Sequence, residues 1–303
     1  MMHMDRDTRR DLIGIGWMLA TGLNFVAVNG IVRGLEGALP APQAAFIRFL
    51  FGLAFLLPLL APALRQGFPS DVWRLFGLRG ALHVLAVIAW FYAMSRIPIA
   101  EVTAIGFLNP IVVAVGAALF LGERLAARRI AAVCVALLGA LVVLRPGLRE
   151  LDPGHLSQVL ASVAFGSSYL VAKRLSERVP AAVVVAMLSL TVTAGLVPLA
   201  WAVWVPPTWA QTGWLALVAV FATAGHYTMT RAFAAAPLTV TQPVVFLQLV
   251  WASLLGVLVF HEPLDGWVIL GGAMMIGAIS YITWREARLR AQARAVPAGA
   301  AEI

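Results

Sequence analysis

The sequence predicts an all-α integral membrane protein with ten transmembrane helices, arranged as two five-helix repeats of opposite orientation. Three observations predict this fold: the composition, a series of long apolar segments, and an internal repeat containing an odd number of them. Of the 303 residues, 61% are hydrophobic and only 12% are charged, with a mean hydropathy of +0.90. Because soluble domains carry about 25% charged residues, this composition indicates a chain that lies mostly in lipid.

The apolar segments have the length that a membrane requires. A helix needs about 20 mostly apolar residues to span a bilayer. The segments of this kind are residues 12–32, 43–62, 75–95, 99–121, 128–144, 156–172, 181–203, 212–230, 239–260 and 266–284. Their connections are short, and we expect no separate soluble domain.

The basic residues indicate the orientation. By loop position, seventeen Arg and Lys residues, Arg79 among them, fall on the side of the N-terminus. Four fall on the opposite side, and Arg48 lies within a helix. Since cytoplasmic loops are enriched in Arg and Lys, both termini are predicted to be cytoplasmic. The same scatter of short basic clusters between apolar runs argues against a nucleic-acid-binding face.

An internal repeat sets the domain organisation. Shifting the chain by 139 residues aligns Pro98 with Pro237 and Glu123 with Glu262. The expected units are a cytoplasmic segment 1–11, repeats 12–147 and 148–284, and a cytoplasmic tail 285–303. Because each repeat has five spans, the second enters the membrane inverted, as in transporters that bind substrate between their halves.

Specific motifs carry a family resemblance. The segment AFIRFLFGLAFLLPL contains an Arg-Phe pair in the second helix, and GFLNPIVVAVGAALFLGERL contains a Leu-x-Pro and a closing Gly-Glu, before a Gly-rich fifth helix. The chain resembles two tandem EamA domains of the drug/metabolite transporter superfamily. This resemblance implies a ten-helix exporter of small metabolites in the bacterial inner membrane, related to aromatic amino-acid exporters. Leu249 and His261 depart from it, standing where a proline and a glycine are expected.

Charged residues within or next to the spans are the first candidates for function, because they are expensive in lipid. Arg48 could meet a substrate carboxylate or form a structural ion pair. Glu101, Glu123 and Glu262 lie at helix ends and are interpreted as structural or gating charges. Proton coupling by the last two is the alternative.

Polar and aromatic residues within the spans are predicted to line a substrate cavity, with helix packing as the alternative for each. These candidates are Trp17, Asn24, His83, Trp90, Asn109, Tyr169, His226, Gln248 and Trp251. Small residues at four-residue spacing, Ala132/Ala136/Ala140 and Ala273/Gly277, are predicted to let the fifth and tenth helices approach closely.

The leading hypothesis is a monomeric alternating-access exporter, within a lipid bilayer, of small amphipathic metabolites, above all apolar or aromatic amino acids. A multidrug or quaternary-amine extruder is the first alternative. An intramembrane lipid-modifying enzyme is the second, although no catalytic motif supports an enzyme. No cofactor, metal ion or nucleic acid is expected.

Overall fold

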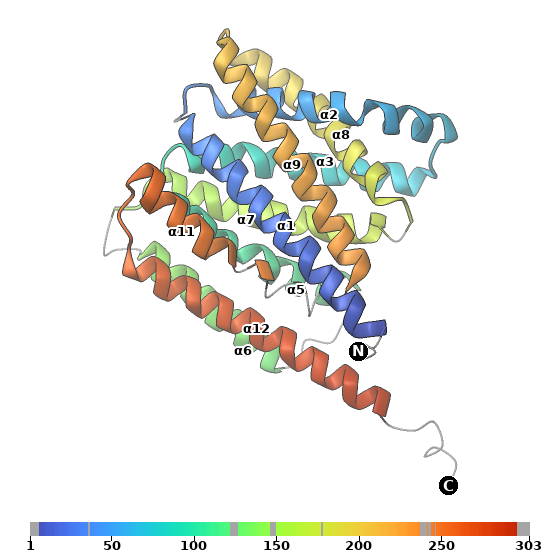
Figure 1. The fold of residues 1–303 in the computed structure, drawn as a ribbon, viewed down its shortest axis with the longest axis vertical. Coiled ribbons are helices and arrows are strands. Elements are labelled where there is room, and N and C mark those ends of the chain that lie inside the picture. Colours follow the sequence, from blue (N-terminus) through green and yellow to red (C-terminus); the bar gives the residue numbers. More distant parts are fainter. Residues whose placement is uncertain are drawn as a thin grey trace, which may run out of the picture.

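The computed structural model describes residues 6–35, 37–121, 127–145, 150–176, 178–236, 241, 244–245 and 247–295, and no strand occurs among them (Figure 1). The fold is all-α. Its helices are α1 (Arg6–Gly34), α2 (Ala41–Gln66), α3 (Ser70–Met94), α4 (Ile99–Gly106), α5 (Leu108–Leu121), α6 (Ala127–Leu144), α7 (Pro153–Ser176), α8 (Ala181–Ala202), α9 (Trp209–Ala235), α11 (Leu247–Phe260) and α12 (Gly266–Ala295).

The described helices follow the expected membrane spans. By length and composition, four described segments are able to cross a membrane: Arg10–Gly34, Ala41–Arg65, Ser70–Met94 and Ala181–Ala202. Shorter apolar stretches occupy other expected spans: Ile99–Val113, Cys134–Leu144, Leu247–Phe260 and Gly266–Ala278.

The expected helix 99–121 is in fact two helices. α4 and α5 meet at a turn on Phe107. Pro110 has no N–H to donate to the carbonyl of Gly106, and its ring would clash with that carbonyl in a continuous helix. The interruption therefore follows from the proline of the Leu-x-Pro pattern.

The packing of the helices has the symmetry of an inverted repeat. In chain order, α1, α2, α3, α5 and α6 of the first repeat correspond to α7, α8, α9, α11 and α12 of the second. α3 packs against α7, and the corresponding contact, α9 against α1, is also present. The contacts α5–α7 and α1–α11 exchange in the same way. The contacts α2–α8 and α6–α12 join equivalent helices directly. The two repeats are thus interleaved across one broad interface.

The start of α1 and the end of α12 lie at the same end of the bundle (Figure 1). We call the opposite end the outer end, after the predicted orientation with cytoplasmic termini; it contains residues 33–35, 37–41, 94–101, 145, 150–155, 203–208 and 261–266. There, Gln43 joins α2 to the loop between α8 and α9: its Nε2 donates to the carbonyl of Val205 at 2.5 Å, and its Oε1 accepts from the amide of Val205 at 2.9 Å.

The close approach of α6 and α12 centres on two glycines that were not expected there, while the expected Ala136 and Ala140 of α6 are buried. A Cβ atom at Gly139 would lie 2.7 Å from the carbonyl oxygen of Gly271, and one at Gly271 would lie 2.4 Å from the carbonyl oxygen of Gly139. Ala273 and Gly277 are exposed, so the expected stripe on the tenth helix is wrong. The tenth helix has small residues both on its buried face, at Gly271, and on its exposed face, at Ala273 and Gly277. Their spacing alone does not show which face is packed.

Candidate functional site

Two histidines from different repeats meet between the helices. His83 on α3 and His226 on α9 have ring centroids 5.6 Å apart and planes inclined at 63°. Their exposed fractions are only 1% and 6%. His83 Nδ1 lies 3.3 Å from Ser168 Oγ on α7. His226 Nδ1 is buried and has no hydrogen-bond partner among the described residues, so a ring nitrogen remains available for a ligand.

Two buried arginines lie within electrostatic reach of both histidines. Arg79 Nη1, on α3, donates to the carbonyl of Val184 on α8 at 2.9 Å. The guanidinium carbon of Arg48, on α2, lies 4.1 Å from the ring centroid of Phe49. Both Nε atoms are buried without a partner in the part of the chain that the structure describes. Each arginine therefore keeps a donor for an incoming acceptor.

The helices around these arginines supply no acidic counter-ion. α2, α7, α8 and α9 contain no Asp or Glu, and α3 contains only Asp71, in its first turn. Asp71 is exposed and pairs with Arg178 instead. Because burying an unpaired charge is unfavourable, this arrangement favours a ligand that brings negative charge or strong acceptors.

Aromatic rings form the apolar part of the site. Phe49 and Phe165 pack edge-on against His83, with centroids 5.8 and 5.0 Å away. Phe25 packs against His226, with ring centroids 5.3 Å apart. The neighbouring Gly225 leaves room for this ring, since a Cβ atom there would lie 3.0 Å from the ring of Phe25. Tyr169 stacks on Phe165 at 6.0 Å. We define the central cluster as Arg48, Arg79, His83, Ser168, Tyr169 and His226.

The structure brings together four residues that the sequence singled out: Arg48, His83, Tyr169 and His226. Sequence reasoning missed Arg79, which was counted among the cytoplasmic basic residues. It lies more than two turns inside α3 and is only 3% exposed, so the interior of the bundle holds more charge than expected. Arg79 already lies within the expected span 75–95, and α3 begins five residues earlier, at Ser70; this position inside the span is the signal that could have revealed it.

Several expected cavity residues do not join the central cluster. Trp17 packs against Tyr227, with centroids 6.5 Å apart, and Arg231 lies over its ring. Asn24 Nδ2 donates to the carbonyl of Ala20 in its own helix at 2.7 Å. These contacts are local to α1 and α9.

Tryptophans deeper in the spans also lie elsewhere. Trp90 packs edge-on against Phe91 at 5.1 Å and against the apolar core. Trp251 is 42% exposed and shares the outward apolar face of α11 with Leu247 and Leu254. Trp251 therefore lies apart from the central cluster, and its place in a substrate cavity stays a prediction.

Two amides lie on helices next to the cluster helices. Asn109, on α5, has a buried Oδ1 without a hydrogen-bond partner among the described residues. Gln248, on α11, packs near Gly22 of α1: a Cβ atom placed on Gly22 would lie 3.6 Å from Gln248 Cγ. Asn109 thus lies on a helix of the α5–α7 contact and Gln248 on a helix of the α1–α11 contact, and these two contacts are equivalent in the two repeats.

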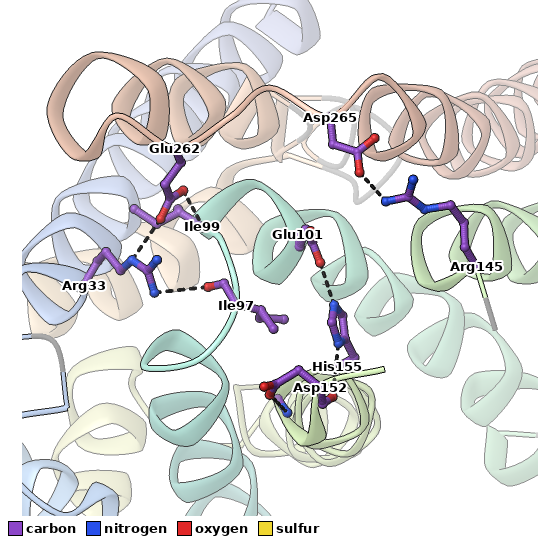
Figure 2. A network of polar contacts seen from close by, with 10 residues as sticks. Arg33, Ile97, Ile99, Glu101, Arg145, Asp152, His155, Glu262 and Asp265 are labelled. Carbon is purple, nitrogen blue, oxygen red and sulfur yellow. Dashed lines mark hydrogen bonds and ion pairs between the residues drawn. The ribbon is translucent and has the colours of Figure 1, made fainter. Parts of the chain in front are cut away.

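A second polar network lies at the outer end (Figure 2). Glu262 Oε1 forms an ion pair with Arg33 Nε at 2.8 Å, and its Oε2 accepts from the amide of Ile99 at 3.0 Å. Arg33 Nη1 also donates to the carbonyls of Met94 and Ile97, at 3.0 and 3.3 Å. One carboxylate thus joins α1, the end of α11 and the start of α4.

The same network contains a buried acid–base pair. Glu101 Oε2 lies 2.6 Å from His155 Nε2, and both side chains are buried. Arg145 pairs with Asp265 nearby. Glu101 was expected at the membrane interface, but it is enclosed between α4 and α7. Glu123, the expected equivalent of Glu262, lies outside the described residues.

A hollow with an apolar wall lies apart from these polar groups. It has a volume of about 400 Å³ between α2, α8 and α9. Its lining is Phe55, Leu56, Leu59, Ala182, Val185, Val220, Thr223, Ala224 and Tyr227. This almost wholly apolar wall fits a lipid chain better than a polar metabolite.

Comparisons with known proteins agree with this architecture. The model of the EamA-like transporter family matches the chain twice, over residues 10–145 and 152–284. A riboflavin transporter of Rhizobium johnstonii is 32% identical, covering 92% of this chain and 93% of its own. A pseudopaline exporter of Pseudomonas aeruginosa is 28% identical (88% and 95%). An S-adenosylmethionine uptake transporter of Rickettsia bellii is 27% identical (90% and 94%).

A solved crystal structure shares the fold. It aligns with a TM-score of 0.61 and 22% identity, covering 93% of this chain and 99% of the other. Two family matches, relatives aligned over nearly their whole length and the interleaved helical repeats lead to one conclusion: the chain is an integral membrane transporter, not an enzyme, and it belongs to the EamA-like transporter family.

Proposed function

We propose that this transporter carries small metabolites that combine a planar ring with a carboxylate or another acceptor-rich edge, and that the central cluster binds them. One observation carries the proposal: Arg48 and Arg79 are buried on α2 and α3, whose one carboxylate, Asp71, is exposed and pairs with Arg178. The missing negative partner would come from the substrate.

The donors of the cluster suit such a partner. An arginine presents a planar fork of N–H donors, which matches a carboxylate or the edge of a ring with several acceptors. A neutral histidine can donate or accept, according to which ring nitrogen carries the proton. The edges and faces of Phe25, Phe49 and Phe165 offer apolar surface to a flat ring.

Two of the cargoes that the relatives carry, riboflavin and S-adenosylmethionine, share the ring and the acceptors. Riboflavin has a planar ring with carbonyl and nitrogen acceptors, and S-adenosylmethionine joins an adenine ring to a carboxylate. Aromatic amino acids, expected from the sequence, also combine a ring with a carboxylate. A quaternary amine that has no carboxylate, such as choline, would bring a third positive charge beside two arginines without a negative group to pair with them, and Coulomb repulsion disfavours it.

Transport by the purified chain tests the proposal. Proteoliposomes would be offered riboflavin, tryptophan, phenylalanine, S-adenosylmethionine and choline, each labelled, with protein-free vesicles as the control. We expect saturable movement of riboflavin or an aromatic amino acid, and none of choline. Transport of choline alone would overturn the proposed substrate class.

The direction of transport is measured in the same vesicles. Export is the working proposal, and the relatives include both an exporter and an uptake transporter. Efflux from loaded vesicles and uptake into empty ones would be compared at equal substrate gradients, with the orientation of the protein determined by proteolysis of its C-terminal tail. Net movement toward the side of the termini would overturn export.

A further inference from the structure

We propose that the central cluster binds a small monovalent inorganic anion, such as chloride, when no metabolite is bound, and that an incoming metabolite displaces it. The inference rests on the site proposed above for the metabolite, and it names a second ligand for the same donors. Three properties of the cluster support it: its charge, its unpaired donors and the close contact of its rings.

The charge of the cluster is not balanced by the helices around it. Arginine stays protonated in proteins, so Arg48 and Arg79 bring two positive charges between the helices. Asp and Glu are absent from α2, α5, α7, α8, α9 and α11, and α3 has only the exposed Asp71. In α1 the last acid is Asp11, which precedes Phe25 by 14 residues, or about 20 Å of helix. Because an uncompensated buried charge is costly, a ligand that supplies negative charge stabilises the cluster.

Neighbouring residues satisfy only part of the hydrogen-bond donors. Arg79 Nη1 donates to the carbonyl of Val184 at 2.9 Å, but Arg79 Nε and Arg48 Nε are buried without a partner among the described residues. His226 Nδ1, from the other repeat, is unpaired among the same residues and donates when it carries the ring proton. Arg48, Arg79 and His226 are each more than nine-tenths buried. Since a monatomic anion accepts hydrogen bonds from any direction, it suits donors that come from α2, α3 and α9 together.

The contacts between the rings favour a small ligand. Four ring pairs have centroids only 5.0–5.8 Å apart: Phe165–His83, Phe25–His226, His83–His226 and Phe49–His83. A metabolite ring could enter between them only if the helices separated. Chloride is a single atom about as large as a methyl group, so small adjustments of the side-chain ends are enough to admit it.

The charge of the ion is restricted by the cost of burying it. The free energy needed to remove an ion from water rises with the square of its charge, so a sulfate or hydrogen phosphate dianion is disfavoured more than a halide. A guanidinium is more weakly hydrated than an ammonium, which suits pairing with a weakly hydrated anion. A halide therefore compensates part of the buried charge at a lower desolvation cost.

The anion and the metabolite would compete for the same donors. The acceptor edge of the metabolite is proposed to meet Arg48 and Arg79, which also hold the anion. Each ligand therefore lowers the apparent affinity for the other, in proportion to the concentration of the competitor. During transport, release of the metabolite would be followed by capture of the anion, so the buried arginines keep a negative partner.

Binding of radiolabelled chloride tests the proposal directly. The purified chain in detergent would be equilibrated with the label in gluconate buffer at an ionic strength of about 0.15 M, and the bound ion measured by scintillation proximity. We expect saturable binding by wild type and by Arg65→Gln, whose arginine lies at the exposed end of α2. Arg79→Gln should lose about tenfold or more in affinity. Absence of saturable binding, or equal affinity in Arg79→Gln and wild type, would overturn the proposal.

A second variant and two other ions keep the test decisive. If Arg79→Gln does not give a monodisperse protein, Arg48→Gln replaces it, with the same expected loss of chloride affinity. Unlabelled bromide should displace the label, and sulfate at equal ionic strength should not. Displacement by sulfate but not by bromide would overturn the assignment to a monovalent ion.

Competition separates this inference from the proposed substrate class. Riboflavin or tryptophan should displace labelled chloride from wild type, and choline should not. If one of these metabolites binds in gluconate buffer without displacing chloride, the proposed function stands and the shared site is wrong. If chloride binding depends on Arg79 but no metabolite of the transport panel binds, the substrate class is wrong and the anion site is supported.

Discussion

His83 and His226 face each other across the interface of the two repeats, with ring centroids 5.6 Å apart. Each lies on a helix that packs against the opposite repeat, α3 on α7 and α9 on α1. A rocking motion of one repeat against the other, as in alternating access, would change the distance between these rings. The central cluster therefore lies where binding and movement can influence each other.

Removing one guanidinium of the cluster should impair transport. Arg79→Gln removes the positive charge of a residue that is only 3% exposed and lies near His83. Because hydrogen bonds to charged groups contribute about 1.5–3 kcal/mol, we expect transport efficiency to fall by about 10–100-fold. The initial rate in proteoliposomes measures it. Arg65→Gln, at the exposed end of α2, is the control and should stay near wild type; equal loss in both variants would contradict a specific role.

Breaking the Glu262 contacts should open the outer end. In a Cys134→Ala background, Ile97→Cys places a thiol at a position that is 2% exposed beside Arg33. Adding Glu262→Gln removes the charge that Arg33 pairs with. We expect several-fold faster labelling by a membrane-impermeant maleimide. Unchanged labelling would show that this carboxylate does not hold the outer end closed.

The left-handed backbone at His261 predicts a stabilising substitution. His261 has φ of +53°, where the family pattern has glycine. Since this region costs a residue with a Cβ atom about 1–2 kcal/mol, His261→Gly should raise the free energy of unfolding by about 1 kcal/mol after the entropy of glycine is counted. Thermal unfolding in detergent measures it. His261→Ala keeps the strain and should not stabilise; an equal gain from alanine would contradict this explanation.

The glycine contact between α6 and α12 predicts a matched pair of variants. Gly139→Ala would place a Cβ atom 2.7 Å from the carbonyl oxygen of Gly271, so the helices must separate. We expect a loss of about 1–3 kcal/mol. Gly277→Ala meets no atom within 4 Å and should be neutral or slightly stabilising. The reverse order in an unfolding experiment would contradict the observed crossing.

The membrane fold was predictable from the sequence because apolar length and the repeat are properties of the chain alone. Pro110 also contained the information that α4 and α5 are separate. What the sequence could not provide was the direction of each side chain: Trp251 is 42% exposed on α11, whereas His226 is only 6% exposed and lies in the cluster. Such directions depend on which helices pack together.

Charged residues show the same limit. Counting basic residues by loop placed Arg79 at the cytoplasmic side, because the count assumed that α3 begins near residue 75 and not at Ser70. Glu101 and His155 are far apart in sequence, and nothing in their local patterns indicates a contact of 2.6 Å. Only the packing of α4 against α7 creates that pair.

Binding of riboflavin to the purified chain tests the central claim most directly. Quenching of its fluorescence would be measured for wild type, Arg79→Gln and Arg65→Gln, with tryptophan and choline as competitors. The account predicts saturable binding by wild type and Arg65→Gln, loss of about tenfold or more in affinity in Arg79→Gln, and displacement by tryptophan but not by choline. Equal affinity in Arg79→Gln and wild type, or displacement by choline alone, would contradict it.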